Sequence, residues 1–275
     1  MCEVGKKLRL NRILDPKTGR TVIIALDHGV EHGPSDFPEK VLDPRVIVKA
    51  TADGGANGIM LHKGVARYTA EEWMGKIPLI LKLTGRTNLS PEELAMQTPV
   101  ASVEDAVSLG ADAVALTIYV GSTNEAKMMK NFGKVETRCR QLGMPILALM
   151  YPRGPGIKDK YNVEGVRYAA RLGAELGVDI VKTYYTGSAD TFRKVVKSCP
   201  VPVVAAGGPR KDTAEEVLTM VKEVMEAGAA GVTIGRNVWA YGDPVGMIEA
   251  IHDIVFENAS AKEALKRLQL SARRK

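Results

Sequence analysis

The sequence has few cysteines, few aromatic residues and no long hydrophobic run. Its three cysteines, Cys2, Cys139 and Cys199, are far apart and show no CxxC spacing. An odd number without such spacing argues against a disulfide framework and against a structural zinc site. The N-terminal segment lacks an apolar signal core, and no apolar run approaches the length of about 18 residues that a membrane span needs. We therefore expect a cytoplasmic protein with no membrane partner.

Basic residues exceed acidic ones, but they do not gather into a known binding motif. The formal net charge is +6, and the lysines and arginines are scattered, without a zinc-finger, cold-shock or stacking-aromatic pattern. We therefore expect no nucleic-acid partner. The same surplus of positive charge would attract small phosphorylated anions.

Aliphatic residues and glycine are abundant. Hydrophobic residues make up 45% of the 275 positions and aromatic residues only 5%, and there are 27 glycines. An interior of Val, Ile, Leu and Ala suits parallel strands that are buried on both faces. The length also fits a single α/β barrel, which typically needs about 250 residues.

A short apolar run followed by a helical segment recurs along the chain. The predicted strands cover residues 21–27, 58–64, 78–85, 113–121, 145–154, 179–187, 202–208 and 231–237. Segments with helical periodicity lie between them, and several end at a glycine that suits a left-handed C-cap. Examples are 163–176, 190–197, 213–227 and 244–257. This alternation predicts a (β/α)8 TIM barrel, with residues 1–275 as one catalytic domain. Residues 86–99 form a longer excursion placed to shape a pocket mouth.

Lys182 interrupts the apolar run DIVKTYY in the middle of a predicted strand. Barrel enzymes carry their catalytic groups at the C-terminal ends of strands. An isolated buried ammonium is costly, so this lysine is either paired or neutral. Burial lowers the pKa of a lysine and makes its neutral amine a nucleophile towards carbonyls. Lys63 and Lys82 are rivals at other strand ends, and the alternative role of Lys63 is that of a rim charge.

Asp27 and Tyr151 are the candidates for proton transfer. Asp27 ends a strand of aliphatic residues, where its carboxylate would serve as a general base or as a cap for the following turn. Tyr151, in the sequence YPRG, has a phenol with an ordinary pKa of about 10. It would act as an acid beside a cation, or it would be a core tyrosine with a satisfied hydroxyl.

The sequences GGP and GRN end the seventh and eighth predicted strands, where barrels commonly bind phosphate. Gly207, Gly208 and Gly235 allow the backbone to approach an anion closely. Arg236 adds a cationic partner with bidentate geometry. Each glycine motif alone is equally compatible with a simple turn, so the prediction rests on their joint position.

His28 and His32 lie with Asp27 and Glu31 in the short sequence DHGVEHGP. These are potential metal ligands, but no third histidine is near and two glycines bend the segment. We therefore expect no metal here, and a hydrogen-bonding role towards a substrate or a loop instead.

Seven stretches together resemble one family of enzymes. They are ALDHGVEHGP, LILKLTGRT, SVEDAVSLGADAVALTIYVGS, MYPRG, IVKTYYTG, AAGGP and IGRNVW. On these motifs the chain resembles the archaeal-type class I fructose-bisphosphate aldolases and their relative, 2-amino-3,7-dideoxy-D-threo-hept-6-ulosonate synthase. The resemblance covers most of the chain. It implies a TIM barrel that uses no cofactor and forms a homo-oligomer, often a decamer.

The resemblance also implies roles for individual residues. Lys182 would be the Schiff-base lysine, Tyr151 the proton donor and Asp27 a proton acceptor. The residues implied to line the substrate and its phosphate are His28, Gly29, Val30, Glu31, Pro152, Arg153, Gly207, Gly208, Gly235 and Arg236.

Three functions are compatible with these residues. The first is a metal-independent class I aldolase that interconverts fructose 1,6-bisphosphate with dihydroxyacetone phosphate and glyceraldehyde 3-phosphate, in glycolysis or gluconeogenesis. The second is the synthase, a transaldolase-type enzyme of archaeal aromatic amino acid biosynthesis, which uses the same iminium but a different acceptor. The third is a non-catalytic phosphosugar-binding barrel. Lys182, Tyr151 and Asp27 together argue against it, because binding alone does not need a buried neutral amine.

Overall fold

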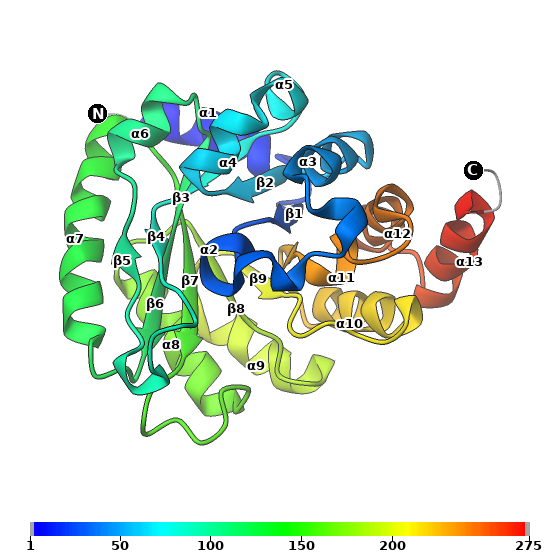
Figure 1. The fold of residues 1–275 in the computed structure, drawn as a ribbon. Coiled ribbons are helices and arrows are strands. Elements are labelled where there is room, and N and C mark those ends of the chain that lie inside the picture. The colour runs from blue at the N-terminus through cyan, green and yellow to red at the C-terminus, as the bar shows by residue number, and fades with distance from the viewer. Residues whose placement is uncertain (1–2, 273–275) are drawn as a thin grey trace.

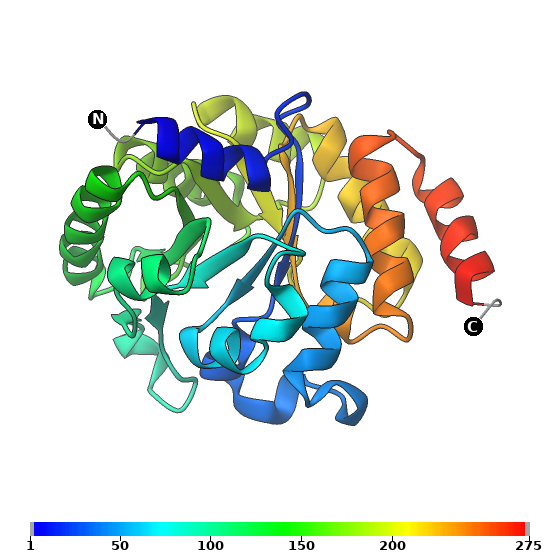
Figure 2. The ribbon, with the colours of Figure 1, turned by 90° about the horizontal axis from the view of Figure 1, so that it is seen from above.

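The computed structural model describes residues 3–272, in which eight parallel strands close into a barrel surrounded by helices (Figures 1 and 2). Neighbouring strands follow the order β1-β10-β9-β8-β7-β6-β3-β2. The strands are β1 (Thr21–Ala25), β2 (Gly58–Leu61), β3 (Leu79–Lys82), β6 (Ala113–Val120), β7 (Ile146–Pro152), β8 (Ile180–Tyr184), β9 (Val203–Ala206) and β10 (Gly231–Ile234). The predicted (β/α)8 barrel and its eight strands are confirmed.

Amphipathic helices cover the outside of the barrel. They are α3 (Pro44–Asp53), α4 (Lys63–Tyr68), α5 (Ala70–Trp73), α6 (Val103–Ser108), α7 (Glu125–Leu142), α8 (Val163–Glu175), α9 (Ala189–Ser198), α10 (Ala214–Glu226) and α12 (Pro244–Phe256). The four helices predicted from periodicity, now α8, α9, α10 and α12, are confirmed with shifts of one residue at their ends. The predicted glycine C-caps are also present, for example Gly143 with a φ of 62°.

Helix α1 (Glu3–Ile13) closes the end of the barrel opposite its mouth. Lys6 forms a 2.7 Å salt bridge with Asp179, which directly precedes β8. Ile13 is fully buried in one cluster with interior side chains such as Ile180. The sequence did not reveal this helix, because most of its residues are polar and only a narrow apolar stripe near its end faces the barrel.

Short elements at the C-terminal ends of the strands build the mouth. They are α2 (His28–His32), η1 (Gly33–Asp36), η2 (Glu39–Val41), η3 (Glu92–Leu94), α11 (Arg236–Trp239) and the two-residue strands β4 (Thr84–Gly85) and β5 (Thr98–Pro99). β4 and β5 pair antiparallel and bracket the predicted excursion. Asn88, Glu92 and Gln97 from this excursion line the central cavity, so its predicted position at the pocket mouth is confirmed.

The last helix, α13 (Ala261–Ala272), packs against α10 and α12 outside the barrel (Figure 1). Within residues 3–272, no helix is both long and apolar enough to cross a bilayer. Cys139 and Cys199 are free and buried, and Cys2 lies outside the described residues.

Candidate active site

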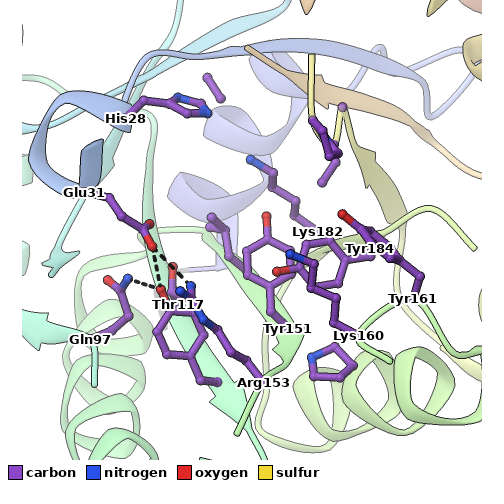
Figure 3. A pocket seen from close by; sticks show the side chains of 18 of the residues that line it. His28, Glu31, Gln97, Thr117, Tyr151, Arg153, Lys160, Tyr161, Lys182 and Tyr184 are labelled. Carbon is purple, nitrogen blue, oxygen red and sulfur yellow. Dashed lines mark hydrogen bonds and ion pairs between the residues drawn. The ribbon is translucent and has the colours of Figure 1, made fainter. Parts of the chain in front are cut away.

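A cavity of about 850 Å³ opens at the C-terminal mouth of the barrel (Figure 3). Of the residues proposed from the sequence, it is lined by Asp27, His28, Glu31, Tyr151, Pro152, Arg153, Lys182, Gly207, Gly208, Gly235 and Arg236. In the described structure Gly29 and Val30 are not part of this lining. They lie on α2, where positions three apart share a face, so His28 and Glu31 face the cavity together while the two residues between them turn away.

Lys182 lies on β8, and its side chain is inside the mouth (Figure 3). The residue is only 5% exposed. Its ammonium makes no hydrogen bond or salt bridge within residues 3–272. Burial lowers the pKa of Lys182 to about 8. The positive charges of Lys82 and Arg236 also lower this pKa, whereas the negative charge of Asp27 raises it. Roughly a tenth of such an amine is neutral at pH 7, and this is the form that attacks carbonyls.

Asp27 and Lys82 form a buried ion pair at the base of the cavity. The Lys82 ammonium donates to Asp27 Oδ2 at 3.1 Å. Burial alone would raise the pKa of Asp27, but the charge of Lys82 holds that pKa well below its usual range. The other rival lysine, Lys63, has a side chain that is 40% exposed and lies 3.3 Å from Asp105 at the rim. Lys182 is therefore the buried lysine that has no ionic partner among the described residues.

Tyr151 is the last residue but one of β7, and its ring stacks on the ring of Tyr184. The two centroids are 4.3 Å apart, with an angle of 18° between the planes. Burial raises the pKa of Tyr151 well above its ordinary value, and Tyr184 and Asp27 raise it further. The phenol therefore keeps its proton at neutral pH, which suits a proton donor.

The glycines that follow β9 and β10 bring backbone to the cavity wall. A Cβ on Gly207 would lie 2.5 Å from Ile234 Cγ1, and one on Gly235 would lie 2.6 Å from the Ala25 carbonyl oxygen. Gly208 has a φ of 69°, which favours glycine. A larger side chain at any of these three positions would clash or would strain the loop. This part of the cavity wall therefore presents backbone groups, and not side chains, to a ligand.

Arg236 places its guanidinium beside this glycine wall. Its Nη2 donates to the Gly208 carbonyl oxygen at 3.3 Å, and its Nη1 lies 3.5 Å from Asp36 Oδ2. Its Nε is buried and has no hydrogen-bond partner among residues 3–272. A buried cationic donor without a partner suits a ligand that brings an anion.

Asn237, which was not among the residues proposed as site residues, holds the segment after β9 against α11. Its side-chain amide donates to the carbonyl oxygens of Gly207 at 2.8 Å and Pro209 at 3.0 Å. Its Oδ1 accepts a hydrogen bond from the Lys211 backbone N–H at 2.7 Å. The GRN motif contains this residue, but its partners lie about 30 positions away in the chain, where no local pattern indicates them.

His28 faces the cavity from α2, and its ring meets the edge of Trp239, with centroids 5.5 Å apart. Burial lowers the pKa of His28 to about 4, although Asp27 acts in the opposite direction. The imidazole is therefore neutral at pH 7 and is available for hydrogen bonding. Within residues 3–272, no group of three or more His, Cys, Asp or Glu side chains is placed to hold a metal ion.

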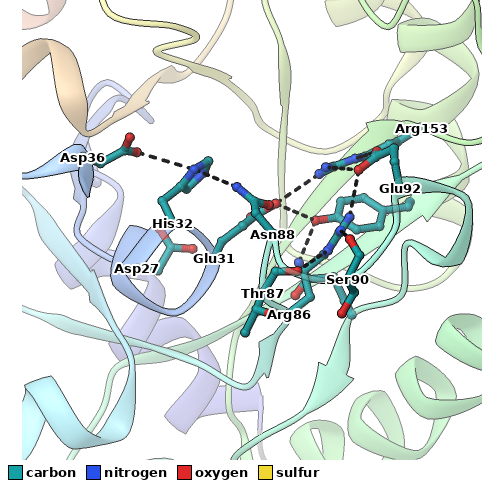
Figure 4. A network of polar contacts seen from close by, with 12 residues as sticks. Asp27, Glu31, His32, Asp36, Arg86, Thr87, Asn88, Ser90, Glu92 and Arg153 are labelled. Carbon is teal, nitrogen blue, oxygen red and sulfur yellow. Dashed lines mark hydrogen bonds and ion pairs between the residues drawn. The ribbon is translucent and has the colours of Figure 1, made fainter. Parts of the chain in front are cut away.

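Arg153 marks the side of the cavity formed by β6, β7 and α2 (Figures 3 and 4). Its Nη1 donates to Glu31 Oε1 at 3.1 Å, and its Nη2 donates to Glu92 Oε2 at 2.8 Å. Its guanidinium lies 4.6 Å from the centre of the Tyr119 ring. Glu92 and Tyr119 were absent from the proposed site residues, because Glu92 lies in none of the family motifs and Tyr119, although it lies in the motif that ends in TIYVGS, was given no chemical role.

Two further lining residues, Lys160 and Tyr161, come from the loop between β7 and α8 (Figure 3). Lys160 Nζ lies 5.4 Å from the ring centre of Tyr161 and 5.9 Å from that of Tyr184. Neither residue was proposed from the sequence. The two lysines of the segment KDKYN, shortly after YPRGPG, were the signal from which a basic loop near the site could have been predicted.

The fold and the site together define a class of protein. A closed parallel barrel that holds a buried amine, an ionised carboxylate and a neutral phenol at its C-terminal mouth is an enzyme barrel suited to carbonyl chemistry. The sequence profile of the DeoC/LacD family aldolases matches residues 21–241. The chain belongs to this family, as the resemblance of its motifs to class I aldolases predicted.

Two curated relatives are similar along nearly the whole chain. The class 1 fructose-bisphosphate aldolase of Thermoproteus tenax is 39% identical over 252 residues, which cover 90% of this chain and 94% of that protein. The 2-amino-4,5-dihydroxy-6-oxo-7-(phosphonooxy)heptanoate synthase of Streptomyces griseus is 36% identical over 256 residues, covering 93% and 92%. The relatives therefore include both an aldolase and a synthase of a seven-carbon amino acid.

Among solved structures, the chain is similar to an archaeal fructose-1,6-bisphosphate aldolase whose catalytic lysine is covalently bound to the carbinolamine intermediate of the substrate. The TM-score is 0.85 and the identity 38%, over 91% of this chain and 99% of the other.

Proposed function

We propose that this protein cleaves and forms fructose 1,6-bisphosphate as a class I aldolase, with Lys182 as the amine that binds the ketone. The observation that carries the proposal is the buried Lys182, which has a lowered pKa and lies beside the ionised Asp27 and the neutral Tyr151. The similarity to the Thermoproteus tenax aldolase supports the choice of substrate.

The chemistry follows from these three groups. The neutral amine of Lys182 attacks the ketone carbon, and loss of water gives an iminium that withdraws electrons. Asp27 accepts the proton of the hydroxyl group next to the scissile bond. The carbon–carbon bond breaks, which releases the aldehyde and leaves an enamine on Lys182. Tyr151 then donates a proton to the enamine carbon, and water hydrolyses the iminium to release dihydroxyacetone phosphate.

The phosphate next to the ketone is placed against the glycine wall. Gly207, Gly208 and Gly235 let its oxygens approach backbone N–H groups, and Arg236 brings a guanidinium with a free buried Nε. His28 and Glu31 face the hydroxyl groups of the sugar from α2, and Pro152 and Arg153 face it from the end of β7.

Cleavage of fructose 1,6-bisphosphate in excess EDTA tests the function directly. We expect sustained release of triose phosphates, measured with coupled enzymes that need no metal, because an iminium on Lys182 replaces a metal ion as the electron sink. Borohydride added with dihydroxyacetone phosphate should fix a stable adduct, and peptide mapping should place it on Lys182. An adduct on Lys82 or Lys63, or activity that EDTA abolishes, would contradict the proposal.

The pH dependence of kcat/KM is a second expected result. The reactive form of Lys182 is the neutral amine, and the pKa of this group is lowered to about 8. The value of kcat/KM should therefore rise about tenfold per pH unit below pH 8 and level off above it. A profile measured between pH 6.5 and 9 that stays flat would show that another group supplies the amine or that the lysine is already neutral.

A second candidate function uses the same iminium with a different acceptor. Glu31 and Arg153 lie 3.1 Å apart at the cavity wall, and together they match the ammonium and carboxylate of an amino-acid aldehyde. The similarity to the Streptomyces griseus synthase favours this alternative. Mass spectrometry of a mixture with dihydroxyacetone phosphate and aspartate semialdehyde would reveal the condensation product. Its absence, with rapid fructose 1,6-bisphosphate cleavage, would remove this candidate.

We also propose a cellular setting. The enzyme acts in the cytoplasm as a homo-oligomer, of decameric size by resemblance, and serves glycolysis or gluconeogenesis. Under the second candidate function it serves aromatic amino acid biosynthesis. Light scattering of the purified protein at several concentrations tests the oligomer.

A further inference from the structure

One carboxylate at the cavity mouth is shared by two guanidinium groups (Figure 4). Glu92 Oε2 accepts hydrogen bonds from Arg153 Nη2 at 2.8 Å and from Arg86 Nη1 at 3.2 Å, and Glu92 Oε1 accepts a further bond from Arg153 Nε. The side chains of Arg86 and Arg153 are 4% and 22% exposed, whereas that of Glu92 is 58% exposed. A largely exposed glutamate therefore pairs with two arginines that are more deeply placed than it is.

The guanidinium of Arg153 is held in place by groups other than Glu92. Tyr119 lies beneath its plane at 4.6 Å, and Glu31 takes Nη1 at 3.1 Å. Its opposite edge, which carries Nε and Nη2, is bound by Glu92. Two parallel donors on one edge are the geometry with which arginine binds phosphate as well as carboxylate. Glu92 therefore binds Arg153 at the edge where the oxygens of a phosphate would also bind.

The Arg153 edge and the glycine wall, formed by Gly207, Gly208 and Gly235, lie on opposite sides of Lys182. Around the barrel, β8 with Lys182 stands between β7, which leads to Arg153, and β9 and β10, which lead to Arg236. Both arginines line the same cavity. A ketose bisphosphate joined to Lys182 through its carbonyl carbon has one phosphate beside that carbon and the other at the far end of the carbon chain. The cavity therefore offers an anion position for each end.

Resting on the function proposed above, we infer that Glu92 is a specificity-determining residue, which binds the same edge of Arg153 as the distal phosphate of the substrate. The arriving phosphate takes the Nε and Nη2 edge of Arg153, and the Glu92 carboxylate remains paired with Arg86. Because Arg86 also donates to the Thr87 and Ser90 carbonyl oxygens at 3.3 Å, the loop keeps its anchor during the exchange. A substrate without a distal phosphate leaves Glu92 on Arg153.

The variant Glu92→Gln tests this inference with two substrates. Fructose 1,6-bisphosphate carries the distal phosphate and fructose 1-phosphate lacks it, while the chemistry at Lys182 is the same for both. We expect the KM for the bisphosphate to fall about two- to fivefold, the range for losing a partly exposed ion pair. The KM for fructose 1-phosphate and the kcat values should not change. Glu164→Gln, which breaks the surface pair of Glu164 with Arg167 on α8, is the matched control and should change neither KM.

A second variant, Arg86→Met, removes the partner that retains Glu92. It should raise the KM for the bisphosphate and leave that for fructose 1-phosphate unchanged, and circular dichroism should verify its fold. If Glu92→Gln changes both KM values equally, or changes neither, then Glu92 only holds the loop in place through its ion pairs, and the inference is overturned. A wild-type enzyme that cleaves neither sugar overturns the proposed function and this inference with it.

Discussion

Replacing Lys182 with methionine should reduce aldol cleavage by more than about three orders of magnitude, because no other group can form the iminium that withdraws electrons from the scissile bond. Methionine keeps the length and apolar stem of the side chain, so the barrel should stay intact. The measurement is kcat with fructose 1,6-bisphosphate, together with borohydride trapping followed by mass spectrometry. Lys194→Met, an exposed lysine on α9, is the matched control and should retain full activity.

Lys182→Met should at the same time stabilise the fold. The pKa of Lys182 is lowered from 10.5 to about 8, so the folded state disfavours the charged lysine. This cost is fully present below pH 8, is on the order of 3 kcal/mol, and fades as the pH rises towards the ordinary lysine pKa. The gain in Tm should therefore be largest near pH 7 and disappear above pH 10. A variant with a few per cent of wild-type turnover, or with a lower Tm, would contradict the role given to Lys182.

Replacing Tyr151 with phenylalanine should lower kcat by roughly 10²–10⁴-fold, the usual contribution of a positioned acid–base group. The ring would keep its stacking on Tyr184, so only the hydroxyl is lost. Iminium formation precedes the step assigned to Tyr151. Borohydride should therefore still trap dihydroxyacetone phosphate on Lys182, while solvent deuterium should no longer enter dihydroxyacetone phosphate through the enamine.

The matched control for this experiment is Tyr168→Phe, because Tyr168 is 68% exposed on α8, away from the cavity. It should leave kcat and deuterium incorporation unchanged. Unaltered deuterium incorporation in Tyr151→Phe would assign the proton donation to another group, with Asp27, whose charge acts on Tyr151, as the alternative. Loss of trapping would instead give Tyr151 a part in forming the iminium.

The barrel was predictable because its strands have a simple physical signature. Runs such as 113–121 are apolar on both faces, and the structure buries every residue of Ala113–Val120 between the barrel interior and the helices. The excursion at 86–99 was predictable because it separates two strands without helical periodicity. Helix α1 was missed because its contacts are made with loops far along the chain, which its own sequence does not encode.

The site was predictable where a residue conflicts with its surroundings. Lys182 and Asp27 stand out because charged groups interrupt or end apolar strands, and in the structure Lys182 is buried while the Asp27 side chain is 13% exposed. Glu92 and Asn237 gave no such signal, since each is an ordinary polar residue of a short helical element, and their partners Arg153 and Gly207 lie far away in the chain. Gly29 and Val30 were included with their neighbours because a sequence motif does not indicate which face of a helical turn meets a cavity.

The way α1 closes the barrel bears on the order of events during synthesis. Arg9 donates to the Gly143 carbonyl oxygen and Arg12 pairs with Asp112, contacts that span 134 and 100 positions. At roughly 5–20 residues per second, these partners leave the ribosome on the order of ten seconds after α1 does. Helix α1 therefore docks only after the chain as far as these partners has been made, and during that interval its apolar stripe is exposed to whatever chaperones attend the nascent chain.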